Sequence, residues 1–341
     1  MSDRQQVGQL FTGAVHVPAN NPAEIETLRR LDIGSVILMG RSHVGVDGTR
    51  ALTGRLQPLM QTAADGRIGL LVSADQEGGA VQVLNGPGFS RIPSGLVQGQ
   101  WTGSMLRRQA AGWAEELHRA GVNLDLAPIA DVVPTQIGTK NGPIGRYGRQ
   151  FGDTPDAVAR SEVAFVQGFA EGGVLTTLKH FPGLGRVSGN TDTTATVVDD
   201  ALTRDGNDVT AFRSGIAAGA GFVMVSLATY PRIDPDHKAV FSPVIVDGML
   251  RHDLGFRGVI VSDDLGNAAS VQSVPPARRA LRFLRAGGDL ALTVNTAQLP
   301  AMTEAVLHEM EHDTAFRAKV RRSVRRILSA KQAVGAVRCS R

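Results

Sequence analysis

Charged residues stand at the ends of several apolar segments that have the composition of buried β-strands. Asp75, Asp131, the pair Lys179-His180, and Asp263 each lie where such a segment ends. Only 20% of the chain is charged, so four charged ends among eight candidate strands suggest a shared site. A carboxylate there could attack the anomeric carbon of a sugar. The Lys-His pair would offer a fixed cation and a ring donor for sugar hydroxyls.

A second group with possible chemistry is the pattern H-E-x-x-H, formed by His308, Glu309 and His312. On a helix, two histidines four residues apart can bind zinc, with the glutamate as a base. This segment follows the last candidate strand, carries further acids at Glu311 and Asp313, and has no evident third ligand. We therefore expect a solvated face of an outer helix and no metal site.

The elements that would position these residues are eight apolar runs alternating with helical patterns. The runs are continuously apolar, as expected for strands buried on both faces. This order predicts a single-domain α/β fold, a (β/α)8 TIM barrel over residues 1–335, with a C-terminal tail at 336–341. Chemistry then belongs at the carboxyl ends of the strands. The predicted strands are 10–15, 34–39, 69–74, 122–128, 174–179, 221–226, 258–263 and 289–293; helical patterns include 105–120, 155–171, 207–219, 275–286 and 297–311.

A doubly wound open sheet is the alternative architecture. Gly183, Gly185 and Gly189 approximate its dinucleotide fingerprint, which leaves an NAD- or phosphate-linked enzyme as a weaker possibility. The glycine spacing is wrong, however, and Pro182 stands where a tight strand-to-helix turn is needed.

Composition excludes several classes of protein. The single cysteine, Cys339, rules out a disulfide framework and a cysteine-based metal site. No apolar run approaches the roughly 18 residues of a membrane helix, and the first 20 residues lack a signal-peptide pattern. We expect a cytoplasmic protein with no membrane partner. Aromatic residues make up only 5% of the chain, which argues against a nucleic-acid partner.

Positive charge is concentrated at the C-terminal end. The chain has a net charge of +4, yet residues 317–341 hold nine Lys or Arg and no acid, which leaves 27 basic against 32 acidic residues elsewhere. Val320, Val324, Ile327 and Leu328 repeat there at helical spacing. An amphipathic terminal helix is the simpler interpretation, and a phosphate- or membrane-binding tail is the alternative.

Four segments together carry a family resemblance. They are residues 179–185 (KHFPGLG), 262–265 (SDDL), 75–79 (DQEGG) and 149–152 (RQFG). In this order and at these separations they resemble the β-N-acetylglucosaminidase branch of glycoside hydrolase family 3, over about residues 8–332. The resemblance implies a lone barrel that hydrolyses terminal β-linked N-acetylglucosamine with retention, in muropeptides or chitin fragments. It implies no cofactor, and the oligomeric state stays open.

The resemblance also implies roles for individual residues. Asp263 matches the nucleophile that forms a covalent glycosyl-enzyme, and Asp75, Arg149, Lys179 and His180 match the sugar-binding set. Other interpretations stay open for each. Asp263 and Asp75 could cap helices, Arg149 could be a structural partner of Asp131, and Lys179 and His180 could be a structural pair.

The loop after residue 185 departs from the family pattern. The family's acid/base is a histidine in an Asp-Ser-His triplet, and the corresponding positions here are Asn190, Thr191 and Asp192. A carboxylic acid can serve as the general acid if burial or the nearby Asp263 raises its pKa. We therefore assign Asp192 as the catalytic acid/base. The alternative is a catalytically silent barrel that binds sugar without cleaving it.

Overall fold

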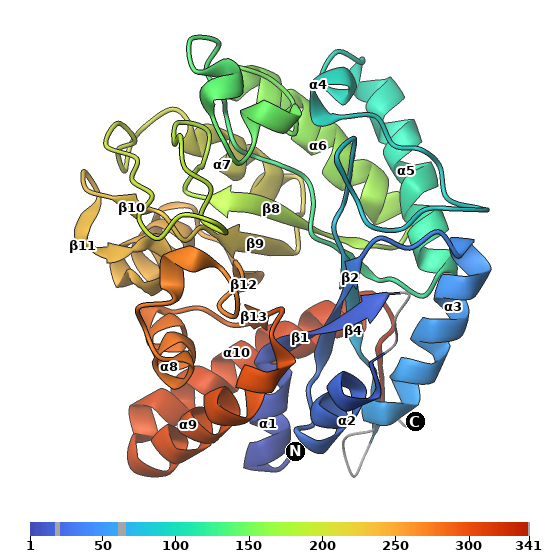
Figure 1. Cartoon of the computed structure of the whole chain (residues 1–341), viewed down its shortest axis with the longest axis vertical. Helices are drawn as coiled ribbons and strands as arrows, with labels where there is room; N and C mark the ends of the chain where they lie inside the picture. Colours follow the sequence, from blue (N-terminus) through green and yellow to red (C-terminus); the bar gives the residue numbers. More distant parts are fainter. Residues whose placement is uncertain (18–20, 61–65, 340–341) are drawn as a thin grey trace.

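Eight parallel strands form a ring in the computed structural model, which describes residues 1–17, 21–60 and 66–339 (Figure 1). Each strand pairs with its neighbours in chain order, and the first strand pairs with the last through Phe11 and Ala291. A parallel bridge between Val261 and Leu290 completes the ring. The predicted barrel is confirmed, and the open sheet is wrong because no unpaired edge is left. The strands are β1 (Phe11–Val17), β2 (Ser35–Gly40), β4 (Leu71–Ala74), β7 (Leu124–Asp125), β8 (Leu175–Phe181), β9 (Phe222–Val225), β12 (Val259–Ser262) and β13 (Ala291–Thr293).

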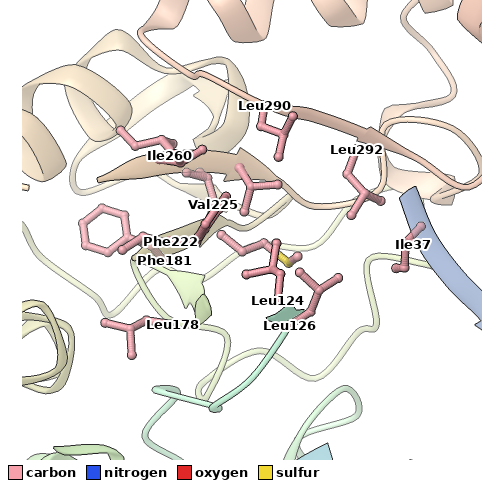
Figure 2. Close-up of a cluster of buried hydrophobic side chains, with 14 of the residues drawn as sticks. Ile37, Leu124, Leu126, Leu178, Phe181, Phe222, Val225, Ile260, Leu290 and Leu292 are labelled. Atoms are coloured by element: carbon pink, nitrogen blue, oxygen red, sulfur yellow. The ribbon is translucent and has the colours of Figure 1, made fainter. Parts of the chain in front are cut away.

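Apolar side chains fill the inside of the ring. Figure 2 shows Leu124 of β7, Leu126 just after it, Ile37 of β2 and Leu292 of β13 in one cluster of buried side chains. These side chains are almost completely buried. A filled interior leaves only the two ends of the barrel for ligands.

The helices surround the ring, and the five predicted helical patterns are all present. Two of the five have a side-chain cap at the start: Thr102 accepts a hydrogen bond from Met105 N, and Thr154 accepts one from Ala157 N. Such caps contribute about 1 kcal/mol each. The helices are α1 (Asp3–Gln9), α2 (Pro22–Arg30), α3 (Gly45–Leu56), α4 (Gly95–Gln98), α5 (Gly103–Arg119), α6 (Pro155–Glu171), α7 (Val209–Ala217), α8 (Pro276–Ala286), α9 (Leu299–His312) and α10 (Thr314–Ala333), with a π-helical segment at Val244–Asp253.

The amino end of the barrel is sealed by the predicted terminal helix, α10. Lys331 is fully buried there, and its Nζ donates to Gln9 Oε1 at 2.6 Å and to the Gly34 carbonyl at 2.7 Å. Arg317, at the start of the same helix, forms an ion pair with Asp3 of α1. The two ends of the chain are thus held together beneath the ring.

Short two-stranded ribbons lie outside the ring. β5 (Gln76–Gly78) pairs with β6 (Val81–Gln82), and β10 (Thr229–Tyr230) pairs with β11 (Asp234–Lys238). β14 (Val337–Cys339), inside the predicted tail, pairs antiparallel with β3 (Gly66–Ile68). Residues 340 and 341 of that tail lie outside the described residues, and the division of the chain at 335 stays a prediction. Among the described residues, no helix has the length and apolarity needed to cross a bilayer.

Candidate active site

A cavity of about 420 Å³ opens at the carboxyl ends of the strands. It collects residues that lie far apart in the sequence, from β2 to the residue after β13. All six residues that the sequence singled out for a site line it: Asp75, Arg149, Lys179, His180, Asp192 and Asp263.

Asp263 follows β12 directly and is partly buried. Its backbone N–H donates to the Val225 carbonyl, and its Oδ1 accepts from Asp264 N at 2.8 Å. Burial, together with repulsion from Asp192, raises the pKa of Asp263 to about 6, although His180 opposes the rise. The helix-cap interpretation is wrong, because the next α-helix, α8, begins only at Pro276.

The neighbouring Asp264 also lines the cavity, but its carboxylate is occupied. It accepts hydrogen bonds from the backbone N–H groups of Gly266, Asn267 and Val294, at 2.8, 2.8 and 2.9 Å. Asp264 therefore fixes the loop after β12, while one oxygen of Asp263 is left for a ligand.

Asp75 and Lys179 belong to a chain of alternating charges on one wall of the cavity. Lys179 Nζ lies 2.6 Å from Asp75 Oδ1 and 2.7 Å from Glu77 Oε1. Arg149 holds the other side of Glu77 through two hydrogen bonds of 2.8 and 2.6 Å. Asp75 precedes β5 and caps no helix, and Arg149 pairs with Glu77 rather than with Asp131.

The charges in this wall hold one another in the ionised state. Burial by itself would raise the pKa of Glu77, but Arg149 and Lys179 lower it to about 2. Burial likewise opposes the charge on Lys179, and yet Asp75 and Glu77 raise its pKa above the usual range. The result is a rigid set of donors and acceptors at fixed positions, suited to the hydroxyl groups of a sugar.

Glu77 had no role in the sequence-based assignment, although it lies two residues after Asp75 in the same DQEGG segment. The structure shows that it is the buried centre of the wall. The sequence feature that could have identified Glu77 is its position in a motif at the end of a strand. What the sequence could not give was the bend that aims both acids at Lys179. That bend comes from the β5–β6 ribbon, which begins with Gln76.

His180 is oriented by Asp131, which the sequence had noted as a strand-end acid and as a possible partner of Arg149. His180 Nδ1 lies 2.8 Å from Asp131 Oδ2, and Asp131 Oδ1 accepts from the backbone N–H groups of His180 and Leu184. Because a carboxylate accepts, the proton is on Nδ1, and Nε2 is the ring nitrogen available to a ligand. The His180–Asp131 pair places this ring next to Asp263, whose pKa it affects.

A further acid, Asp125, lies beneath this wall. It is fully buried, its Oδ1 accepts from Gln76 N at 3.0 Å, and its Oδ2 has no partner among the described residues. Burial raises the pKa of Asp125 well above its ordinary value. Asp125 supports the turn after Asp75 through its hydrogen bond from Gln76 N.

Asp192 lies on the loop between β8 and α7, and this loop is anchored over the cavity. The Asp192 carbonyl accepts from Ala269 N at 3.0 Å, and the Thr191 carbonyl accepts from Ser270 N at 3.1 Å. Asn190 Oδ1 accepts from Asp192 N at 2.9 Å and so shapes the turn. The Asp192 side chain is exposed but lines the same cavity as Asp263, so of the two alternatives that the sequence offered for a general acid, burial is absent and the nearby Asp263 remains.

The H-E-x-x-H segment lies elsewhere, on α9 in the outer layer of helices. His308, Glu311 and His312 are exposed there, with possible ligand atoms within 4.8 Å of one another. None of the three lines the cavity. The segment is thus separate from the candidate active site, as the sequence indicated.

The fold and this cavity define a class: a TIM barrel with carboxylates and paired cations at its mouth, as in enzymes that act on sugars. Residues 3–330 match the model of the glycosyl hydrolase family 3 N terminal domain. The chain belongs to this family, which confirms the resemblance seen in the sequence, and it is a β-N-acetylhexosaminidase-like glycoside hydrolase.

Individual relatives agree with this assignment. A β-hexosaminidase of Stenotrophomonas maltophilia is 35% identical over 71% of this chain and 70% of its own length. A β-hexosaminidase of Methylococcus capsulatus is 31% identical over 89% and 87%, respectively. The crystal structure of a β-N-acetylhexosaminidase from Beutenbergia cavernae superimposes with a TM-score of 0.94, at 45% identity, over 97% of this chain and 99% of that one.

Proposed function

We propose that this protein is a retaining hydrolase of terminal β-linked N-acetylglucosamine, or a related N-acetylhexosamine, with Asp263 as nucleophile and Asp192 as acid/base. The observation that supports it most is the anchored loop 190–192, which keeps a second carboxyl group at the cavity that Asp263 lines. A barrel that only bound sugar would have no need of this arrangement.

The proposed reaction has two steps. In the first, the Asp263 carboxylate attacks the anomeric carbon while the Asp192 carboxylic acid protonates the departing oxygen, which gives a glycosyl ester and a free aglycone. In the second, the Asp192 carboxylate takes a proton from water, the water oxygen bonds to the anomeric carbon, and Asp263 leaves. The configuration at that carbon is inverted twice and so retained.

The other lining residues bind the sugar in this proposal. The Asp75 carboxylate accepts from hydroxyl groups, and Lys179, Arg149 and the Nε2 atom of His180 complete the set. No metal or organic cofactor takes part. The role in peptidoglycan turnover, the muropeptide or chitin-fragment substrate and the cytoplasmic location stay predictions from the sequence.

The direct test is to incubate the protein with an aryl β-N-acetylglucosaminide and, in parallel, with the matching aryl β-glucoside. We expect release of the phenol from the first substrate at a far higher kcat/KM than from the second. The exposed side chain of Asp192 favours the silent barrel as the competing function. Binding of N-acetylglucosamine with no turnover of either glycoside would establish that function instead.

A further inference from the structure

A second cavity lies at the opposite end of the barrel from the candidate active site. It has a volume of about 520 Å³ and is bordered by α10 and by the residues just before β8, β9 and β12. This volume lies within the usual range for small-molecule sites, about 300–1,000 Å³. Its lining includes four arginines, Arg257, Arg322, Arg325 and Arg326, and no acidic residue.

Only one of these four arginines has a partner that accounts for its position. Arg326 donates to Asp289 Oδ1 at 2.9 Å, and Asp289 is a buried acid that also pairs with Arg251. Within residues 1–17, 21–60 and 66–339, no ion pair is formed by Arg257, Arg322 or Arg325. Three exposed guanidinium groups therefore border one hollow with no ion-pair partner among the described residues.

The backbone geometry brings these cations together. Arg322 and Arg325 are three residues apart on α10, so they lie on the same face of that helix. Arg257 comes from a different segment, the loop that leads into β12. The remaining lining is small: Gly219, Gly221, Gly258, Ser329, Ala330 and Ala333 leave room for a ligand beneath the guanidinium groups.

We propose that this cavity binds a phosphate-bearing ligand. A guanidinium group presents a planar fork of donors that fits phosphate oxygens, and several such groups around one hollow match an anion of charge −2 or more. This ligand would also account for the excess of positive charge in residues 317–341, which the amphipathic pattern of the helix alone does not explain. The site is independent of the proposed hydrolysis, because it is at the other end of a filled barrel.

The test uses two sources of phosphate and one matched pair of variants of the full chain. Inorganic pyrophosphate is titrated by calorimetry at low ionic strength, and vesicles of phosphatidylcholine with and without phosphatidic acid are tested by co-sedimentation. Arg325→Gln removes a lining guanidinium. Arg321→Gln makes the same change on the same helix at an exposed residue outside the cavity, and serves as the control.

We expect pyrophosphate to bind the parent and Arg325→Gln to weaken binding about tenfold, as loss of a charged hydrogen bond does, while Arg321→Gln changes it less than twofold. Hydrolysis of an aryl glycoside should be unchanged in both variants. Binding to the phosphatidic acid vesicles with the same dependence on Arg325, and none to pyrophosphate, would identify a lipid headgroup as the source. The proposal is overturned if neither probe binds, if both variants weaken binding equally, or if duplex DNA competes with equal dependence on Arg321.

Discussion

Asp263 and Asp264 are adjacent acids at one cavity, and their hydrogen bonds separate their roles. Asp263 accepts one backbone N–H, whereas the Asp264 carboxylate accepts three. Asp263→Asn should lower kcat on an aryl β-N-acetylglucosaminide by on the order of 10⁴-fold or more, as removal of a covalent nucleophile does elsewhere. Sugar affinity, measured by calorimetry, should stay within a few fold. A larger loss from Asp264→Asn would contradict the assignment of the nucleophile.

Asp192 can be tested by varying the leaving group. Asp192→Ala should slow cleavage of a disaccharide by ~10²–10⁴-fold and affect an activated aryl glycoside less in the first step, because a good leaving group departs without a proton. Azide should restore part of the rate with the activated substrate, since a small anion needs no base in the second step. Cleavage of the disaccharide at the parental rate would mean that Asp192 is structural.

The pH profile links these two acids. A nucleophile must be ionised, and the pKa of Asp263 is raised to about 6 by burial and by repulsion from Asp192. We therefore expect kcat/KM to fall as the pH decreases through about 6. Asp192→Asn removes one source of this repulsion, so the acidic limb of its pH profile should lie at lower pH than in the parent. The residual activity of this variant is measured with an activated aryl glycoside. A limb that stays in place would show that Asp192 does not act on Asp263.

Among the single residues, the strand-end acids and the Lys-His pair could be predicted because parallel strands bring their carboxyl ends together. The partners could not, because they depend on how loops fold. Glu77 needed the β5–β6 turn to reach Arg149, and Asp131 needed the turn at Leu184 to reach His180.

At the scale of elements, the buried ion pairs connect the β5–β6 ribbon to β8 and to the loop that carries Arg149. Glu77→Gln removes the central anion and leaves two buried cations with less counter-charge. Breaking such a buried pair costs about 3–5 kcal/mol. Urea denaturation near pH 7 should show a loss of this size. Glu26→Gln, at an exposed pair with Arg29, is the control and should leave stability almost unchanged, because solvent screens a surface pair.

The pH dependence of that loss has a definite sign. The folded-state pKa of Glu77, about 2, lies below its ordinary value of 4.5, so the contribution of this carboxylate to stability is present above pH 4.5 and is lost as the pH falls toward 2. The parent should therefore lose stability over this range more steeply than Glu77→Gln. Parallel curves for the two proteins would contradict the role of Glu77 in the folded state.

The strand segments could be predicted from their continuous apolar composition, but the lengths of some elements could not. The apolar run extends over 122–128, but β7 is only the pair Leu124–Asp125. After Asp125 the chain stops pairing as a regular strand, because it forms the turn that holds Asp131. The short helices α1 and α2 lack a long amphipathic repeat and are not among the helices predicted here. Each nevertheless begins with a cap that the sequence shows, the Ser2–Gln5 capping box of α1 and Asn21 ahead of Pro22 in α2.

At the scale of the whole molecule, the closed ring could be predicted from the number and order of the strands. The way α10 closes the amino end of the barrel could not be predicted. The sequence predicted α10 but could not show that Lys331 lies fully buried beside Gln9 and the Gly34 carbonyl. A fully buried lysine on a helix is rare. Here the ammonium group is satisfied by hydrogen bonds to α1 and to the residue before β2.

Lys331 gives the fold a second dependence on pH. Burial lowers the pKa of Lys331 to about 7, against 10.5 for an ordinary lysine. The unfolded chain therefore binds more protons than the folded one between these values, and stability should rise with pH over this range. Lys331→Met abolishes the titration. The parent should gain about 1.4 kcal/mol per pH unit relative to this variant between pH 7 and 10, measured by urea denaturation. Equal slopes would show that Lys331 is solvated.

The pairing of the first and last strands of the barrel also determines when the sheet can close during synthesis. β1 pairs with β13 and lies next to the Lys331 seal, so one edge of the first strand has no partner until residues 291–293 have been made. An unpaired strand edge is a template for aggregation. While residues 18–290 are being made, the nascent sheet is thus open and needs protection, and it closes into a barrel only after β13 has been made.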